Sequence, residues 1–156
     1  MIIYFYRTVG THGCFSNFSL HPVFLWGKTW KTSEHAFQGA KFLPHAPELA
    51  EKIFLAEKPM SAANLGRTLS PLRSDWETKI GDGVIEFVKD QVMYDVCLAK
   101  FTQNEDARRI LLSTADLMLV EDSPIDSYWG CGKDKKGANK LGKILQLVRD
   151  KLKLLH

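Results

Sequence analysis

The order of apolar and polar residues along the chain predicts a few short strands among longer helices. The opening run from Ile2 to Tyr6 is β-branched and aromatic, which predicts a strand. Two apolar-aromatic pieces between Val23 and Trp30 flank Gly27-Lys28, and this pattern predicts a hairpin that turns at these two residues. Another short strand is expected over Leu117–Val120.

A helix with clear start and stop signals follows the predicted hairpin. Thr32 and Ser33 stand where an N-cap belongs, and Glu34 falls in the first turn, where a negative charge suits the helix dipole. The helical pattern continues to about Leu43, and Pro44 stops it.

Helices are expected over most of the remaining chain. The clearest covers Val84 to Phe101, where an apolar stripe recurs at helical spacing and Asp82 is the candidate cap. The others are expected over Pro47–Glu57, over Ser61–Leu65 with Gly66 as its end, after Asn104, and over Asn139–Leu154. The sequence therefore predicts one α+β domain over residues 1–156, mainly helical with a few short strands.

Composition adds limits on the class of protein. The chain has 156 residues, of which 45% are hydrophobic, enough for a core without disulfides or metals. Its net charge of +3 suits an anionic substrate but is small for a nucleic-acid-binding domain. Three scattered cysteines indicate a reducing compartment. No signal peptide and no apolar run near the roughly 20 residues of a membrane span are apparent, so we expect a cytoplasmic protein.

The helix after the hairpin carries the first candidate chemistry. Helical spacing places Glu34, Gln38 and Lys41 on one face, at i, i+4 and i+7. Since the rest of this helix is rich in Phe, Ala and Gly, the polar stripe is a candidate wall of a cleft. A solvated face with a weak charge pair is the competing interpretation.

A glycine-rich loop near the end is the second candidate. Gly132 and Gly137 have the spacing of a P-loop, but Ala138-Asn139 stands where Lys and Ser/Thr are required, which excludes a nucleoside triphosphatase of that type. The loop and the helix after it can still bind an anion through backbone N–H groups. A surface turn made soluble by lysines is the alternative.

The sequence also bears on metal binding and on the recognition of a base. No His or Cys spacing typical of a metal site occurs, and we expect neither a metal nor another cofactor. Trp76 lies in a polar segment beside Arg73, so it is either a stacking platform for a base or a core anchor. Arg73 is either a phosphate ligand or a solvated charge.

Together these motifs resemble the NADAR/YbiA-like family, and the resemblance covers nearly the whole chain. The matching segments, in order, are Phe15-Ser16-Asn17-Phe18, Gly27 to Trp30, Thr32 to Phe42, Ala63-Asn64-Leu65-Gly66, Leu72 to Trp76, Ala99-Lys100-Phe101, Asn104, Tyr128-Trp129-Gly130, Asn139, Leu141-Gly142 and Arg149. The loop departs from the family pattern, because Cys131 and Lys135 occupy two places that often hold Asp and Gly there.

The resemblance implies a YbiA-like fold and an N-glycosidase that needs no cofactor. Its substrate is implied to be a phosphorylated ribosylamino-pyrimidine of riboflavin synthesis or ADP-ribose attached to guanine in DNA. By motif position, the implied catalytic residues are Glu34, Lys41 and Asp134. The implied or candidate substrate-binding residues are Arg7, Asn17, Arg73, Trp76, Tyr128, Trp129 and Asn139.

Glu34 and Lys41 are expected to have separate roles in catalysis. Glu34 is expected to supply acid–base catalysis if its cleft raises its pKa, and a desolvated Lys41 is expected to form a Schiff base with the opened sugar. A module that binds ADP-ribose or another NAD derivative without cleaving it is the main alternative. A purely structural partner protein explains neither the polar stripe nor the glycine-rich loop. No membrane partner is expected, and the sequence does not fix the oligomeric state.

Overall fold

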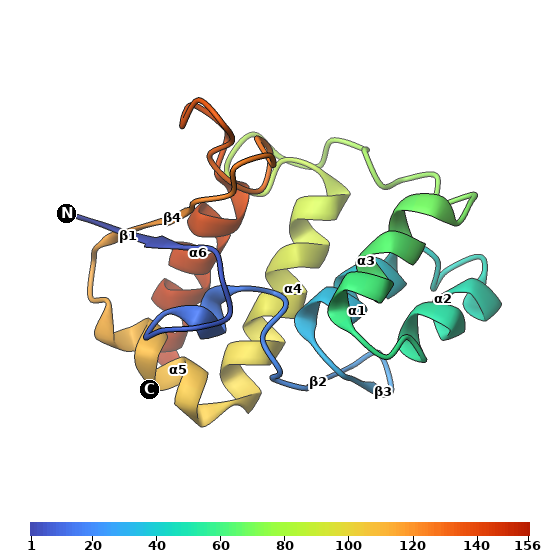
Figure 1. The fold of residues 1–156 in the computed structure, drawn as a ribbon, viewed down its shortest axis with the longest axis horizontal. Helices are drawn as coiled ribbons and strands as arrows, with labels where there is room; N and C mark the ends of the chain where they lie inside the picture. The colour runs from blue at the N-terminus through green and yellow to red at the C-terminus, as the bar shows by residue number, and fades with distance from the viewer.

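Helix α4 (Val88–Gln103) runs through the middle of the molecule, between two groups of elements (Figure 1). The computed structural model describes residues 1–156. One group holds α6 (Lys140–Leu155), α5 (Glu105–Ser113), the strands β1 (Ile2–Phe5) and β4 (Met118–Glu121), and the short 3₁₀ helix η1 (Gly13–Phe15). The other holds α1 (Ser33–Ala40), α2 (Pro47–Phe54) and α3 (Pro59–Thr68), with the strands β2 (Val23–Leu25) and β3 (Lys28–Trp30). The predicted mainly helical α+β fold is confirmed.

β1, at the beginning of the chain, and β4, the last strand before α6, form a parallel pair. β1 and β4 lie side by side with Ile2 opposite Met118 and Phe5 opposite Glu121. This pairing brings the loop after β1 next to the loop after β4. Both strands were predicted, each within one or two residues of its observed bounds.

The hairpin of β2 and β3 turns one residue earlier than predicted. Its turn residues are Trp26 and Gly27, with φ angles of 55° and 77°. Two successive positive φ angles match the right-handed twist of the flanking strands, which is why two-residue hairpins use them. Lys28 is therefore the first residue of β3, paired with Leu25.

Four predicted helix ends are wrong, each for a local reason. α2 ends at Phe54 and not at Glu57, since the N–H of Ala56 bonds the Ile53 carbonyl in a tightened turn. α1 ends at Ala40, since the N–H of Lys41 bonds the Gln38 carbonyl in a tightened turn. α3 continues through Gly66 to Thr68. Gly66 therefore does not end the helix but allows its close packing. α4 starts at Val88 and not near Val84, because Asp90 and not Asp82 bonds the free N–H groups at its start.

Helix α1 is the most enclosed element of the fold. All eight of its residues are buried, and it contacts α2, α3, α4 and both strands of the hairpin. Its last turn packs on Trp30, where a Cβ on Gly39 would lie 2.5 Å from the indole ring. A helix that is buried along its whole length holds its side chains in fixed directions, including the polar ones.

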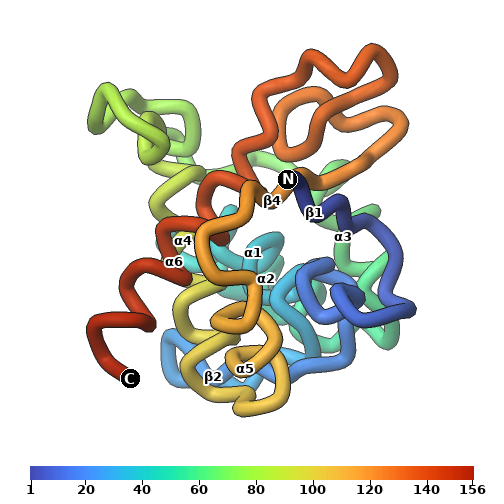
Figure 2. The backbone as a smooth tube through the Cα atoms, turned by 90° about the vertical axis from the view of Figure 1, so that its left-hand side faces the viewer, coloured from blue at the N-terminus to red at the C-terminus, as the bar shows by residue number.

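The segment between β4 and α6 folds back on itself beside the parallel strands (Figure 2). Backbone bonds join its two arms, from Asn139 N–H to Gly130 O at 3.0 Å and from Leu141 N–H to Trp129 O at 2.9 Å. Asn139, in the left-handed region at φ 51°, ties this loop to β4. Its side chain accepts from the Glu121 N–H and donates to the Leu119 carbonyl, both at 2.9 Å.

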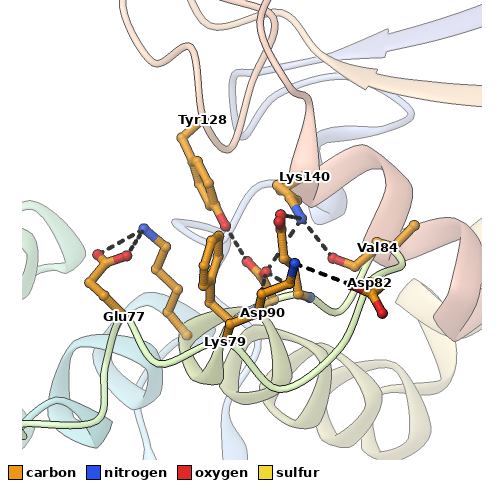
Figure 3. A network of polar contacts seen from close by, with 10 residues as sticks. Glu77, Lys79, Asp82, Val84, Asp90, Tyr128 and Lys140 are labelled. Atoms are coloured by element: carbon orange, nitrogen blue, oxygen red, sulfur yellow. Dashed lines mark hydrogen bonds and ion pairs between the residues drawn. The ribbon is translucent and has the colours of Figure 1, made fainter.

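A buried carboxylate joins the starts of α4 and α6 (Figure 3). Asp90 is fully buried and accepts four hydrogen bonds, from the N–H groups of Glu86 and Phe87, from the Tyr128 hydroxyl at 2.6 Å and from Lys140 Nζ at 3.4 Å. A buried charge is tolerated when its oxygens are satisfied in this way.

We predict that Asp90→Asn lowers the free energy of unfolding by about 3 kcal/mol, because it leaves Lys140 without its buried partner and turns an N–H₂ group toward donors. Urea denaturation followed by circular dichroism measures the loss. Asp82→Asn is the matched control, since Asp82 pairs only with Lys79 on the surface and should change stability little. Equal losses in the two variants would contradict the role of the network.

Candidate functional site

A pocket of about 770 Å³ opens beside α1. It is bounded by α1, α3, the loops after β1 and η1, the end of β4 and the loop that follows it. Its charged lining residues are Arg7, Glu34, Lys41, Arg67, Glu121 and Asp126. Apolar and aromatic walls, among them Phe37 and Trp129, surround these charges, a combination typical of small-molecule sites.

The predicted polar stripe of α1 forms one wall of this pocket. Glu34 and Gln38 are 9% and 6% exposed, and Gln38 Nε2 donates to Glu34 Oε2 at 2.7 Å. A glycine of α3 makes room for the stripe, since a Cβ on Gly66 would stand 1.9 Å from Gln38 Oε1. That amide oxygen has no hydrogen-bond partner. The interpretation of the stripe as a solvated face is therefore wrong.

Burial moves the two ionisable groups of this wall toward neutrality. It raises the pKa of the Glu34 carboxyl, although the Gln38 hydrogen bond and the Lys41 charge oppose the shift. Burial also lowers the pKa of the Lys41 amine, with Glu34 opposing and Arg67 assisting. Lys41 Nζ lies 5.9 Å from the ring centroids of both Phe37 and Trp76. A larger fraction of Lys41 is thus an unprotonated amine than in water.

Three charged pocket residues are not among the sequence-predicted candidates. Glu121 ends β4, Asp126 lies in the following loop, and Arg67 belongs to α3. Asp126 Oδ1 accepts from the N–H of Tyr128 and of Trp129, at 2.9 and 2.8 Å, which fixes the turn that presents Trp129. The available signal was an acidic residue directly after an apolar strand, a usual place for functional side chains in mixed folds.

Arg7, Asn17 and Trp129 line the pocket, as their prediction as binding residues requires. The Asn17 carbonyl accepts from the Glu34 N–H at 3.0 Å, so this residue also anchors the start of α1. Trp129 packs edge-on against Phe37 with 5.3 Å between ring centroids and remains half-buried, facing the pocket. Arg7 is exposed at the rim. Their contact with a substrate stays a prediction.

Two predicted binding residues lie in the structural framework instead. Trp76 is 6% exposed in the main core, tilted against Phe37 at 5.3 Å, so the core interpretation fits it better than base stacking. Tyr128 turns its hydroxyl to Asp90 and is not a lining residue.

The remaining predicted residues also lie outside the pocket. Asn139 uses its side chain to hold β4, and Arg73 pairs with Asp75 at 2.6 Å, where both line a separate pocket of about 530 Å³. Asp134 is exposed, and its Oδ1 accepts from the Lys136 N–H at 3.0 Å. Because the loop carrying Asp134 points to solvent, the structure does not bring this residue to Glu34 and Lys41.

Three further features of the structure concern metal-binding side chains, cysteines and helix length. Nowhere do three or more His, Cys, Asp or Glu side chains gather in a way that could hold a metal ion. All three cysteines are free. None of the helices combines the length and apolar character required to cross a membrane.

Known proteins resemble this chain along nearly its whole length. The NADAR domain matches residues 4–153. An N-glycosidase of Nostoc punctiforme is 42% identical over 99% of this chain and 95% of its own. N-glycosidase YbiA of Escherichia coli is 45% identical over 97% of this chain and 88% of its own. The NMR structure of E. coli YbiA superposes with a TM-score of 0.84, at 43% identity, over 99% of this chain and 86% of that one.

A plant relative extends the comparison. A chloroplastic riboflavin biosynthesis protein of Zea mays, PYRR, is 37% identical over 97% of this chain, which corresponds to 25% of that longer protein. The match of the domain over nearly the full length, and of relatives above 40% identity, shows that the chain belongs to the NADAR domain family.

Proposed function

We propose that this protein is an N-glycosidase that hydrolyses the bond between a phosphorylated ribose and a nitrogenous base. The observation that carries the proposal is that Glu34 and the half-buried Lys41 line the same wall of the pocket, with the carboxyl pKa raised and the amine pKa lowered. Such opposed shifts favour the protonated carboxyl, which can donate a proton, and the unprotonated amine, which can act as a nucleophile. Two relatives that match along almost their whole length bear the name N-glycosidase.

The first half of the proposed reaction breaks the glycosidic bond. The Lys41 amine attacks the anomeric carbon, the C–N bond to the base breaks, and Glu34 gives its proton to the departing base. Glu34 recovers a proton from the new ammonium and passes it to the ring oxygen as the sugar opens. The product of this half is a Schiff base between Lys41 and the sugar.

The second half hydrolyses the Schiff base, so the complete reaction consumes only water. Trp129 is the proposed stacking partner of the base, and its position in the pocket lining beside Phe37 supports this role. Arg7 and Arg67 are the cationic lining residues available to a phosphate.

The substrate is proposed to be a phosphorylated ribosylamino-pyrimidine, with ADP-ribosylated guanine in DNA as the second candidate. The name of the maize relative favours the first. Incubation with each compound, followed by mass spectrometry of the products, tests the proposal, and the free base should appear with one of them. Binding of either compound without release of its base would support the non-catalytic alternative.

We predict that sodium borohydride added during turnover traps the sugar on Lys41, because it reduces a Schiff base to a stable amine. Intact-mass analysis should show the adduct on the wild type and not on Lys41→Arg, which keeps the charge but cannot form the imine. Lys52→Arg, on the exposed face of α2, is the matched control and should trap like the wild type. Full activity of Lys41→Arg would contradict covalent catalysis and favour direct attack by water.

We predict different effects when each of the two tryptophans beside Phe37 is replaced by alanine. Trp129→Ala should weaken substrate binding by about 1–3 kcal/mol, the scale of one lost base stack. Trp76→Ala should instead lower the free energy of unfolding by about 3–5 kcal/mol, as for a buried aromatic side chain. Isothermal titration and chemical denaturation of both variants separate these effects. If Trp76→Ala remains folded and loses affinity for the substrate as Trp129→Ala does, Trp76 is a stacking residue and this prediction is wrong.

A further inference from the structure

The end of β4 carries a carboxyl group that the reaction as proposed so far does not use. Glu121 lines the pocket, and its Oε2 is buried without any hydrogen-bond partner. An unpartnered carboxyl oxygen inside a domain is costly, so it requires an explanation. This carboxyl of a pocket residue therefore has acceptor capacity that no protein group uses.

The backbone of Glu121 is held from several sides, in contrast to the free oxygen of its side chain. Its N–H donates to Asn139 Oδ1 and its carbonyl accepts from the Cys131 N–H, both at 2.9 Å. Pairing with Phe5 on β1 restrains it further. Gly142 allows this arrangement, since a Cβ there would lie 2.1 Å from the Leu119 carbonyl and 2.6 Å from the Asn139 amide. These contacts account for Asn139 and Gly142, two motif positions that lie outside the pocket.

We propose that Glu121 is a second catalytic carboxyl, the base that activates water for hydrolysis of the sugar–Lys41 Schiff base, and that Asn139 is its positioning residue. The inference rests on the proposed function and adds a residue to it. Water forms a C–O bond with the anomeric carbon and gives a proton to Glu121, while the C=N electron pair moves to the Lys41 nitrogen. Glu121 then returns the proton to that nitrogen as the C–N bond breaks. The hydroxyl group that water has formed on the anomeric carbon gives its proton to Glu34 as the aldehyde forms. Glu34 is then protonated and Glu121 is a carboxylate, as at the start of the reaction.

The electrostatic surroundings suit a base that works near neutrality. Burial, followed by the negative charges of Asp126 and Glu34, raises the pKa of Glu121 to about 7. The cationic groups of the pocket are Lys41 directly after α1, Arg67 on α3 and Arg7 after β1, and none of them bonds Glu121. From α4, the Cys97 thiol faces this charge, and burial raises its pKa to about 12, so it stays protonated. General bases are most effective with a pKa near the working pH.

The test is Glu121→Gln, which keeps the shape of the side chain but cannot take a proton. We expect a burst of about one equivalent of released base, followed by steady turnover at least about 100-fold slower than in the wild type. The borohydride-trapped fraction on Lys41 should rise, because the Schiff base accumulates. Asp122→Asn is the control, one residue further along the chain and outside the pocket, and it should show neither effect.

The pH profile gives a second readout. Since the carboxylate form of Glu121 is the active one, the steady-state kcat of the wild type should rise with pH through about 7, and Glu121→Gln should lose this rise. Carbon-detected NMR of the wild type without substrate should show one glutamate carboxyl titrating near this pH, absent from the folded variant.

Three results would overturn the inference. The first is an unchanged kcat with a raised KM in Glu121→Gln, because this marks Glu121 as a ligand for sugar hydroxyls. The second is loss of the burst in that variant. The third is a Glu121 carboxyl of the wild type that titrates below about 5. Failure of the proposed function is distinct from these results, because the wild type would then release no base at all.

Discussion

The burial of a polar stripe within helix α1 is the constraint on which the rest of the structure depends. A helix enclosed by α2, α3, α4 and the hairpin would normally be apolar on every face. Here Glu34 and Gln38 are partners of one another, Gly66 leaves space for the amide, and the remaining polar atoms face a cavity instead of protein. Because neither charge can be solvated fully, the pKa of Glu34 rises and that of Lys41 falls. The fold thus favours the neutral forms of both groups through burial.

The second wall depends on pairing between distant parts of the chain. β1 brings the loop that carries Arg7 beside β4, and β4 ends in Glu121. The loop after β4 returns to α6 through backbone bonds and through Asn139, so Asp126 and Trp129 are fixed relative to Glu121. Motif residues that do not touch the pocket therefore contribute by holding the residues that do.

Local periodicity made α1 predictable, since Glu34, Gln38 and Lys41 share a face by helical geometry alone. Glu121, Asp126 and Arg67 were missed because strand pairing and helix packing bring them to the pocket. The one local signal, an acidic residue directly after an apolar strand, applies to Glu121 alone. Trp76 stands among polar neighbours that face solvent while its own ring turns inward, and a sequence pattern does not distinguish this from a stacking site. The start of α4 was misplaced because the prediction used Asp82 as the cap, whereas the N–H groups there bond Asp90, a residue inside the helix that only tertiary packing buries.

The most direct test of this account is a crystal structure of the protein with ribose 5-phosphate bound, since that compound contains the phosphorylated sugar of the proposed reaction. The account predicts the sugar in the pocket beside α1, with its anomeric carbon next to Lys41 Nζ and its phosphate on Arg7 or Arg67. Binding in the separate pocket beside Arg73, with the space around Glu34 and Lys41 unoccupied, would contradict it.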